Sequence, residues 1–428
     1  MTIALTKGNW PITSPVDALS RGLDLLLIPV VCFVLLIKAY EIFDLYVFLI
    51  IITPVYLIKN LLVDRLAPET PTLNWLDLAV LFVGIVEVVS YATSTYQPNS
   101  LYYLVEALFL FLFYCLIRFN LRHDYQRVAI YLAIAATGFW ISSRALYSFW
   151  RHYGRLNALG FGDASEFKHL FGLVGSDGYA TAERITMLLA FLPFPLILFF
   201  KLKRLRRVRW LMLAPVATIL LALSVTFSRA VYVAVFAFLL VASLLVYRYK
   251  LFSARRIILF NLLVGIVALV CLAPVAKPVL TTLEMFKSKS QVRSLEGRIH
   301  LWRASIDIVE QHPWTGAGAC NFPMRYGGYT EEHTAFVVST FNYFLQILAE
   351  RGALGLLAYS LLLFAFFKTS ADHIKLCKSE LYRLTAILCV ASFGAVIVRD
   401  LTYSSILINK AANAVLWLMF AAIARTEA

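Results

Sequence analysis

Long apolar runs set the first limit on what this chain can fold into. The 428 residues contain repeated runs of about 17–25 apolar side chains, the length that a helix needs to cross the hydrocarbon core of a bilayer. Hydrophobic residues make up 61% of the chain and charged residues 15%, whereas a soluble domain is close to half apolar and a quarter charged. We therefore expect an all-α polytopic membrane protein with about twelve transmembrane helices. The expected spans are 22–37, 44–62, 74–93, 101–117, 128–148, 184–200, 210–227, 230–247, 257–275, 353–367, 384–398 and 405–423.

The positions of Lys and Arg orient these spans. The even-numbered connections are rich in Lys and Arg, and cytoplasmic connections of membrane proteins are enriched in both residues. The sixth connection is the most basic, with Lys201, Lys203, Arg204, Arg206, Arg207 and Arg209. We therefore expect both termini in the cytoplasm and the two long connections, 149–183 and 276–352, in the periplasm.

This topology also accounts for the charge of the chain. Residues 1–428 are expected to form one membrane domain, with short helices in the larger periplasmic loop. Much of the net charge of +14 then follows from the cytoplasmic cations. No basic module interleaved with aromatic residues accompanies that charge, so we expect membrane lipids and not nucleic acid as partners.

A second group of charges lies within or beside the spans, towards the periplasmic end. A charge in hydrocarbon is costly, and it usually faces a partner or a polar cavity. Two interpretations therefore stay open: ion pairs that hold helices together, or a polar cavity that opens outward, which we favour for the group as a whole. Its members are Glu87, Glu106, Arg144, Arg229, Arg399, Asp400 and Lys410.

The two periplasmic loops add further arginines. The planar, permanently charged guanidinium group of arginine binds phosphate through paired hydrogen bonds. An outward pocket lined by arginine therefore indicates a lipid-linked diphosphate as its ligand. The alternative is that the exposed arginines dock on anionic lipid headgroups. The loop arginines are Arg151, Arg155, Arg184, Arg293, Arg298, Arg303, Arg325 and Arg351.

Five stretches resemble motifs of the O-antigen ligase and O-antigen polymerase superfamily. Residues 297–303 read GRIHLWR and residues 311–318 read QHPWTGAG, like the arginine followed by tryptophan and the His-Pro-x-x-Gly-x-Gly turn of that family. Residues 342–355 read NYFLQILAERGALG, like its Asn-x-x-Leu helix ending in Glu-x-Gly-x-x-Gly. Residues 227–230, FSRA, resemble its Ser-Arg-small element, and 155–179 resemble its Arg-to-Pro-Asn segment.

The resemblance implies a function and a fold. Members of this superfamily transfer a glycan from a polyprenyl-diphosphate carrier on the periplasmic side; ligases transfer it to a lipid A-core sugar and polymerases to another repeat unit. It implies a twelve-span fold similar to the C-type membrane glycosyltransferases, in the bacterial inner membrane. It also implies metal-independent chemistry without a cofactor, and the outer loops have no Asp-x-Asp pair. Of the two reactions we favour the ligase, with undecaprenyl diphosphate carrying the glycan and lipid A-core as acceptor.

One position departs from the family pattern. Phe341 stands where the family usually has the histidine of its His-Asn pair, whereas Asn342 is kept. His333 is the nearest outward histidine, and its ordinary pKa range suits a general base near neutrality. Glu331 and Glu332 compete for that role, and His333 could also be a solvated loop residue. We interpret His300 and His312 as structural.

The resemblance also implies a role for each candidate residue of the site. Arg229 and Arg298 align with motif arginines and are expected to bind the diphosphate, with Arg303 and Arg155 after them. Asn342 is expected to orient a sugar or a side chain, and in-line displacement would invert the anomeric carbon.

Glu350 and the glycines that follow it are expected to have a different, structural role. Glu350 lies near a helix end, and Gly352 and Gly355 are expected to ease a turn into the next span.

Two other classes of protein remain as alternatives. A transporter of the same lipid-linked glycan would show charges through the membrane depth and internal repeats with broken helices. A structural partner in an envelope complex would need no arginine-lined pocket. The one-sided group of charges favours the enzyme.

Overall fold

The computed structural model describes most of the chain as helix. It covers residues 73–121, 124–158, 187–202, 206–226, 228–272, 289–327, 339–377, 379–402 and 410–424, with short helical pieces between residues 22 and 58. Across these ranges the chain forms no strand, which confirms the all-α class.

The helices before the large loop are α3 (Trp75–Ala92), α4 (Gln97–Asn120), α5 (Asp124–Ala158), η2 (Met187–Ala190), α8 (Pro193–Lys201), α9 (Arg206–Leu211), α10 (Leu213–Ser224), α11 (Arg229–Arg248) and α12 (Ala254–Leu272). The remaining helices are α14 (Lys289–Gln311), α15 (Phe322–Gly327), α16 (Tyr343–Leu376), α17 (Glu380–Asp400) and α19 (Lys410–Ala424).

Six of the described helices are long and apolar enough to cross a membrane. They are Trp75–Ala92, Gln97–Asn120, Asp124–Arg151, Ala230–Arg248, Tyr343–Leu376 and Tyr382–Asp400. Three shorter apolar helices accompany them, at Met187–Lys201, Arg209–Ser224 and Asn413–Ala424. The first two expected spans lie largely outside the described residues, so the count of twelve stays a prediction.

Three helices differ in extent from the expected spans and loops. α5 continues to Ala158, past the expected start of the first long loop at residue 149. α16 begins at Tyr343, ten residues before the expected span, and α14 is a helix of 23 residues. The reason is that hydropathy marks where a helix leaves the hydrocarbon, whereas hydrogen bonding decides where the helix itself ends.

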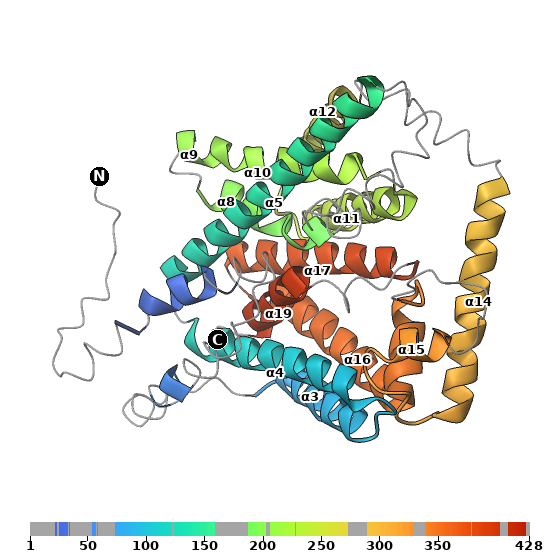
Figure 1. The fold of residues 1–428 in the computed structure, drawn as a ribbon. Coiled ribbons are helices and arrows are strands. Elements are labelled where there is room, and N and C mark those ends of the chain that lie inside the picture. The colour runs from blue at the N-terminus through green and yellow to red at the C-terminus, as the bar shows by residue number, and fades with distance from the viewer. Residues whose placement is uncertain are drawn as a thin grey trace.

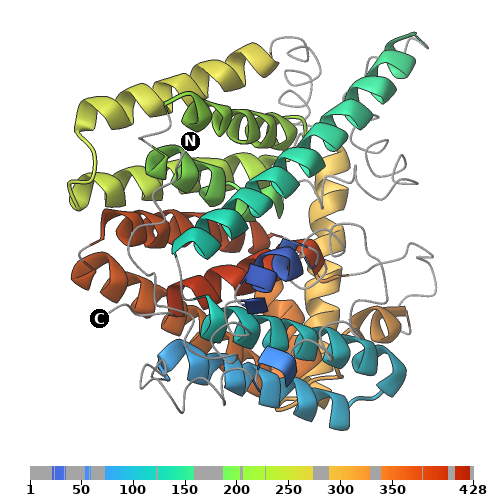
Figure 2. The same cartoon turned by 90° about the vertical axis from the view of Figure 1, so that its left-hand side faces the viewer.

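The helices pack in layers around α16, α17 and α19. α3 and α4 lie on one side of this group, and α5, α8, α10 and α11 lie on the other (Figures 1 and 2). Phe366, Phe393 and Phe420 join the three central helices, with ring centroids 5.0 to 5.2 Å apart. α14 stands across the bundle at one end, beside α15 and the start of α16 (Figure 1).

α3 shows how one helix combines a buried and a lipid-facing side. Leu78, Leu81, Ile85 and Val88 are exposed at intervals of three and four residues, which places them on one stripe. Its other side is buried and includes Glu87. Apolar side chains exposed along a helix long enough to span a bilayer are what contact with lipid requires.

A buried ion pair fixes the other end of α3 to α4. The Asp77 carboxylate accepts hydrogen bonds from Arg118 Nε at 3.0 Å and from the Tyr114 hydroxyl at 2.5 Å. Asp77 also accepts from the backbone N–H of Asn74, completing a capping box at the start of the helix. These contacts set the two helices side by side, with their opposite ends against the loop after α14.

Candidate active site

The central feature of the site is a break in α16 at Gly352. This residue has φ +63° and ψ −164°, so the helix that runs from Tyr343 stops there and restarts at once. A Cβ atom on Gly352 would lie 2.3 Å from the carbonyl carbon of Trp314, closer than side chains approach backbone. The turn predicted at Gly352 is therefore present, and it depends on glycine for both its backbone angle and its space.

The loop at residues 313–318 supplies the hydrogen bonds that the broken helix lacks. In an uninterrupted helix the N–H groups of residues 353 and 354 would donate to the carbonyls of residues 349 and 350. Each of these four groups bonds to the loop instead. The bonds are Ala317 N to Ala349 O at 2.9 Å, Gly318 N to Glu350 O at 2.9 Å, Ala353 N to Pro313 O at 2.9 Å and Leu354 N to Trp314 O at 3.1 Å. The break therefore leaves none of these four groups unsatisfied.

Two loop glycines allow the loop to pack closely on its neighbours. Gly316 and Gly318 have φ of +67° and +101°. A Cβ on Gly316 would lie 2.3 Å from the carbonyl carbon of Glu350, and one on Gly318 would lie 2.3 Å from Ser94 Oγ. The two family-like motifs, 311–318 and 350–355, are thus the two halves of one interlocked structure.

Beneath the break lies a buried network of charged side chains. Arg351 Nε donates to Glu87 Oε1 at 2.5 Å, and its Nη1 donates to Glu350 Oε2 at 3.1 Å. Tyr359 also donates to Glu87, at 2.8 Å, and Gln346 donates to Glu350 at 2.5 Å. Arg351 and Glu87 are only 3% and 2% exposed. The prediction of Arg351 as an outward loop arginine is wrong: burial and pairing with two carboxylates commit it to holding α16 against α3.

This network bears on the two interpretations of the embedded charges. Glu87 pairs with Arg351, and Arg399 Nη1 donates to Asp400 at 2.8 Å. For Glu87 the interpretation of an ion pair that holds two helices together is therefore confirmed, whereas the pair of Arg399 and Asp400 lies within α17 alone.

One face of α14 carries two side chains toward the segment before α16. Arg298 and Trp302 are four residues apart, so they lie on the same side of the helix. Trp302 Nε1 donates to the carbonyl of Thr340 at 3.1 Å. The Arg298 guanidinium lies 5.6 Å from the ring centroid of Phe341, within cation–π range. The aromatic ring at the family's histidine position therefore helps to place Arg298.

Asn342 links the start of α16 to the end of α17. Its side-chain oxygen accepts from the N–H of Leu345 at 3.0 Å, which makes it the N-cap of α16. Its amide nitrogen donates to the carbonyl of Leu401 at 3.1 Å. Asn342 thus sets the position of the segment that carries Phe341.

Among the remaining predicted site residues, the structure describes the side chain of Arg303 but not those of the others. Arg303 is exposed on α14, and because it follows Arg298 by five residues it points about 140° away around the helix. Arg229 is the first residue of α11 and Arg155 lies near the end of α5, but both side chains lie outside the described residues, as do His333, Glu331 and Glu332. The described residues therefore bring together Arg298, Phe341 and Asn342.

Cys320 adds a feature that its sequence position does not indicate. It lies in the loop after Gly318 with φ +60°, and the Tyr103 hydroxyl hydrogen-bonds to its sulfur. Burial and then the nearby Glu350 carboxylate raise the pKa of the Cys320 thiol to about 11. The thiol is therefore a neutral packing group between the loop and α4.

Part of the chain matches a known protein family. The family model Wzy_C, described as O-antigen ligase, matches residues 214–360. The matched range contains Arg229, Arg298, Asn342 and both interlocked motifs. No curated protein matches the chain.

Proposed function

Residues 214–360 match the O-antigen ligase family model, and from that premise we propose that the protein is a glycan ligase of the bacterial inner membrane. It transfers a glycan from undecaprenyl diphosphate to a lipid A-core sugar on the periplasmic side. The observation that carries the proposal is the placement of Arg298 within the matched range, over Phe341 in the segment that precedes α16. A fixed cation at the surface end of a membrane-spanning helix suits a diphosphate whose lipid tail lies in the bilayer.

The first requirement of the reaction is stabilisation of the leaving diphosphate. When the bond between the sugar C1 and the diphosphate breaks, negative charge grows on the departing oxygen, and a positioned arginine stabilises that charge without a proton transfer. Arg298 and Arg229 take this role, with Arg155 after them, whereas Arg303 points about 140° away from Arg298 around α14 and is not proposed for the same diphosphate. The ring of Phe341 limits the freedom of Arg298, which reduces the entropy lost when the diphosphate binds.

The acceptor hydroxyl is the second group. It attacks C1 from the face opposite the diphosphate, so the anomeric carbon is inverted, and it loses its proton as the new bond forms. His333 takes that proton as general base. Asn342 contributes by fixing the start of α16, which orients Phe341 and through it Arg298.

A two-acceptor transfer assay tests this proposal. Purified protein in liposomes receives an undecaprenyl-diphosphate glycan and, in separate tubes, lipid A-core or a second carrier-linked glycan. We expect transfer to lipid A-core, detected as a mobility shift on a gel. Chain growth on the carrier alone would make the protein a polymerase. Donor binding without transfer in either tube would contradict both enzymes and favour a transporter.

Arg229→Ala is the variant to include in that assay. If Arg229 binds the diphosphate, transfer is lost while protein level and membrane insertion stay normal. Near-normal transfer by this variant would remove Arg229 from the site.

A further inference from the structure

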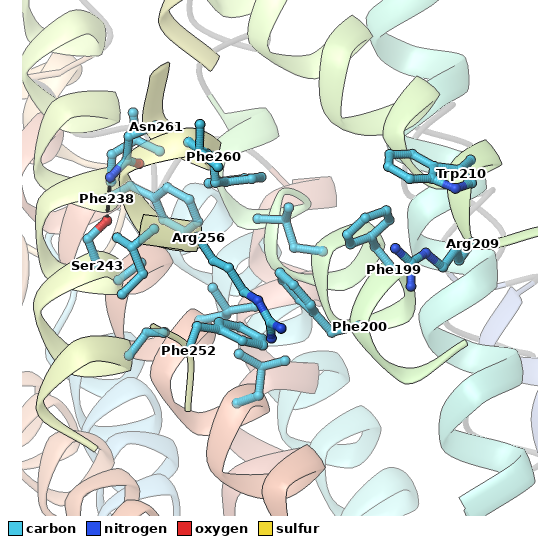
Figure 3. A pocket seen from close by; sticks show the side chains of 18 residues that line it. Phe199, Phe200, Arg209, Trp210, Phe238, Ser243, Phe252, Arg256, Phe260 and Asn261 are labelled. Carbon is cyan, nitrogen blue, oxygen red and sulfur yellow. Dashed lines mark hydrogen bonds between the residues drawn. The ribbon is translucent and has the colours of Figure 1, made fainter. Parts of the chain in front are cut away.

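A cavity of about 670 Å³ lies between α8, α11, α12 and α17, apart from the candidate active site. Most of its wall is apolar, with Phe199, Phe200, Phe238, Phe252 and Phe260 among the lining residues (Figure 3). A hydrogen bond of 2.8 Å from Asn261 to Ser243 joins α12 to α11 along one wall. Most of this wall offers no hydrogen-bond partner to water, so a hydrocarbon chain suits it.

The cavity lies at the opposite end of the bundle from the active site. Leu384 and Leu388 line it from the beginning of α17, whereas Leu401, just after that helix, bonds to Asn342. Seventeen residues of helix separate Leu384 from Leu401, about 25 Å along the axis. The ends of the helices near the cavity are rich in Lys and Arg, which the positive-inside rule places in the cytoplasmic leaflet.

Two arginines give the apolar cavity a charged edge. Figure 3 shows Arg256 extending from α12 between Phe252 and Phe200. Arg209 lies on the other side, with its guanidinium 5.0 Å from the ring centroid of Phe199. Within the described part of the chain neither arginine forms an ion pair, and Arg209 Nε is buried without a hydrogen-bond partner.

We propose that this cavity binds an anionic glycerophospholipid of the cytoplasmic leaflet, with an acyl chain in the apolar part and the phosphate on Arg256. The wall matches a hydrocarbon chain, and the edge offers positive charge without a described carboxylate to neutralise it. Arginine at the level of the headgroups binds lipid phosphate through charge-assisted hydrogen bonds. This inference does not depend on the proposed glycan transfer, because it concerns other residues at the other membrane face.

Lipid binding by the purified, delipidated protein tests the charged part of the proposal. Native mass spectrometry would count bound phosphatidylglycerol and, separately, phosphatidylethanolamine with the same acyl chains. We expect tighter binding of phosphatidylglycerol, weakened about tenfold by Arg256→Ala. Arg255→Ala is the matched control, because Arg255 is a neighbouring exposed cation outside the cavity lining, and it should bind within about twofold of the unaltered protein. Equal losses in the two variants, or no preference for phosphatidylglycerol, would overturn the proposal.

A second pair of variants tests the apolar part. Ala242 is a buried lining residue on α11, and Ala242→Trp should fill the cavity and weaken phosphatidylglycerol binding. Leu240→Trp, on the exposed side of the same helix, should leave binding intact. Unchanged binding in a monodisperse Ala242→Trp protein would overturn the proposal. Displacement of the phospholipid by equimolar undecaprenyl phosphate would also overturn it, in favour of a site for the carrier's tail.

Discussion

Arg298 is the predicted site residue whose surroundings are described in most detail. Its place on the inner side of α14 follows from a residue four positions away, Trp302, which is tied to the Thr340 carbonyl. Phe341 then faces the guanidinium. Arg298 and the segment in which Phe341 replaces the family's histidine are therefore parts of one arrangement.

From this arrangement we expect Arg298→Ala to lower the initial rate of glycan transfer by about 100-fold or more, the loss typical of removing one donor to a developing negative charge. Arg298→Lys should keep part of the rate, because it retains the charge but loses the planar fork. Rates would be measured in the liposome assay at saturating acceptor. Asp307→Ala, an exposed change on the same helix, should stay near the unaltered rate, and equal rates in all variants would exclude Arg298 from the reaction.

Cys320 supports a prediction about pH. The thiolate is the form that reacts with maleimide, and the raised pKa of about 11 leaves on the order of 100-fold less thiolate at pH 8 than in a free thiol. In a variant that keeps only Cys320, labelling of the folded protein should therefore be slow and should rise about tenfold from pH 8 to 9. The same protein in SDS should label fast and gain only about threefold. Equal labelling in both states would contradict the burial of this thiol.

At the scale of elements, the break in α16 and the loop that fills it form one unit. Gly352→Ala places a Cβ against Trp314 at a φ that side chains rarely adopt, so we expect a loss of about 2–4 kcal/mol in the free energy of unfolding. The apparent melting temperature of the detergent-solubilised protein would report it. Gly394→Ala in α17, where a Cβ would meet nothing within 4 Å, should leave the melting temperature almost unchanged. A normal melting temperature for Gly352→Ala would mean that the turn does not need glycine.

The contact between α3 and α16 depends in the same way on Arg351. Replacing it with Met leaves the Glu87 and Glu350 carboxylates buried without their shared cation, which should cost about 3–5 kcal/mol. Adding Glu87→Gln removes one of the stranded charges, so the double variant should be more stable than Arg351→Met alone. Thermal unfolding of the single and double variants would give the coupling between the two positions, and additive losses would contradict the pairing.

The turn at Gly352 could be predicted from the sequence, whereas the ion pair between Glu87 and Arg351 could not. Gly352 belongs to a motif whose spacing predicts a turn, and that turn is present. Glu87 and Arg351 are separated by 264 positions, and nothing local to either residue indicates the other. The N-cap role of Asn342 could not be predicted either, because α16 begins ten residues before the expected apolar span. Short-range features were thus predictable, whereas contacts between distant helices depended on how those helices pack.

At the scale of the whole molecule, the proposed function depends on which ends of the helices face the periplasm. Trp314 in the interlocked loop is 69% exposed, and Leu376 at the far end of α16 is 79% exposed. In a cysteine-free background we expect Trp314→Cys to react with a membrane-impermeant maleimide in intact spheroplasts. Leu376→Cys should react only after the membrane is opened. The reverse pattern would put the site in the cytoplasm and contradict transfer to lipid A-core.

The interlocked turn also limits where the chain can be joined to that of a relative in a chimeric protein. A graft that replaced the large loop up to the membrane surface would take residues 313–318 from one parent and residues 349–354 from the other. Their four backbone hydrogen bonds and the two close contacts of Gly316 and Gly352 would then have to match by chance. The smallest portable unit therefore extends beyond Gly355, into the span itself, and a chimera joined any earlier would separate two halves of one structure.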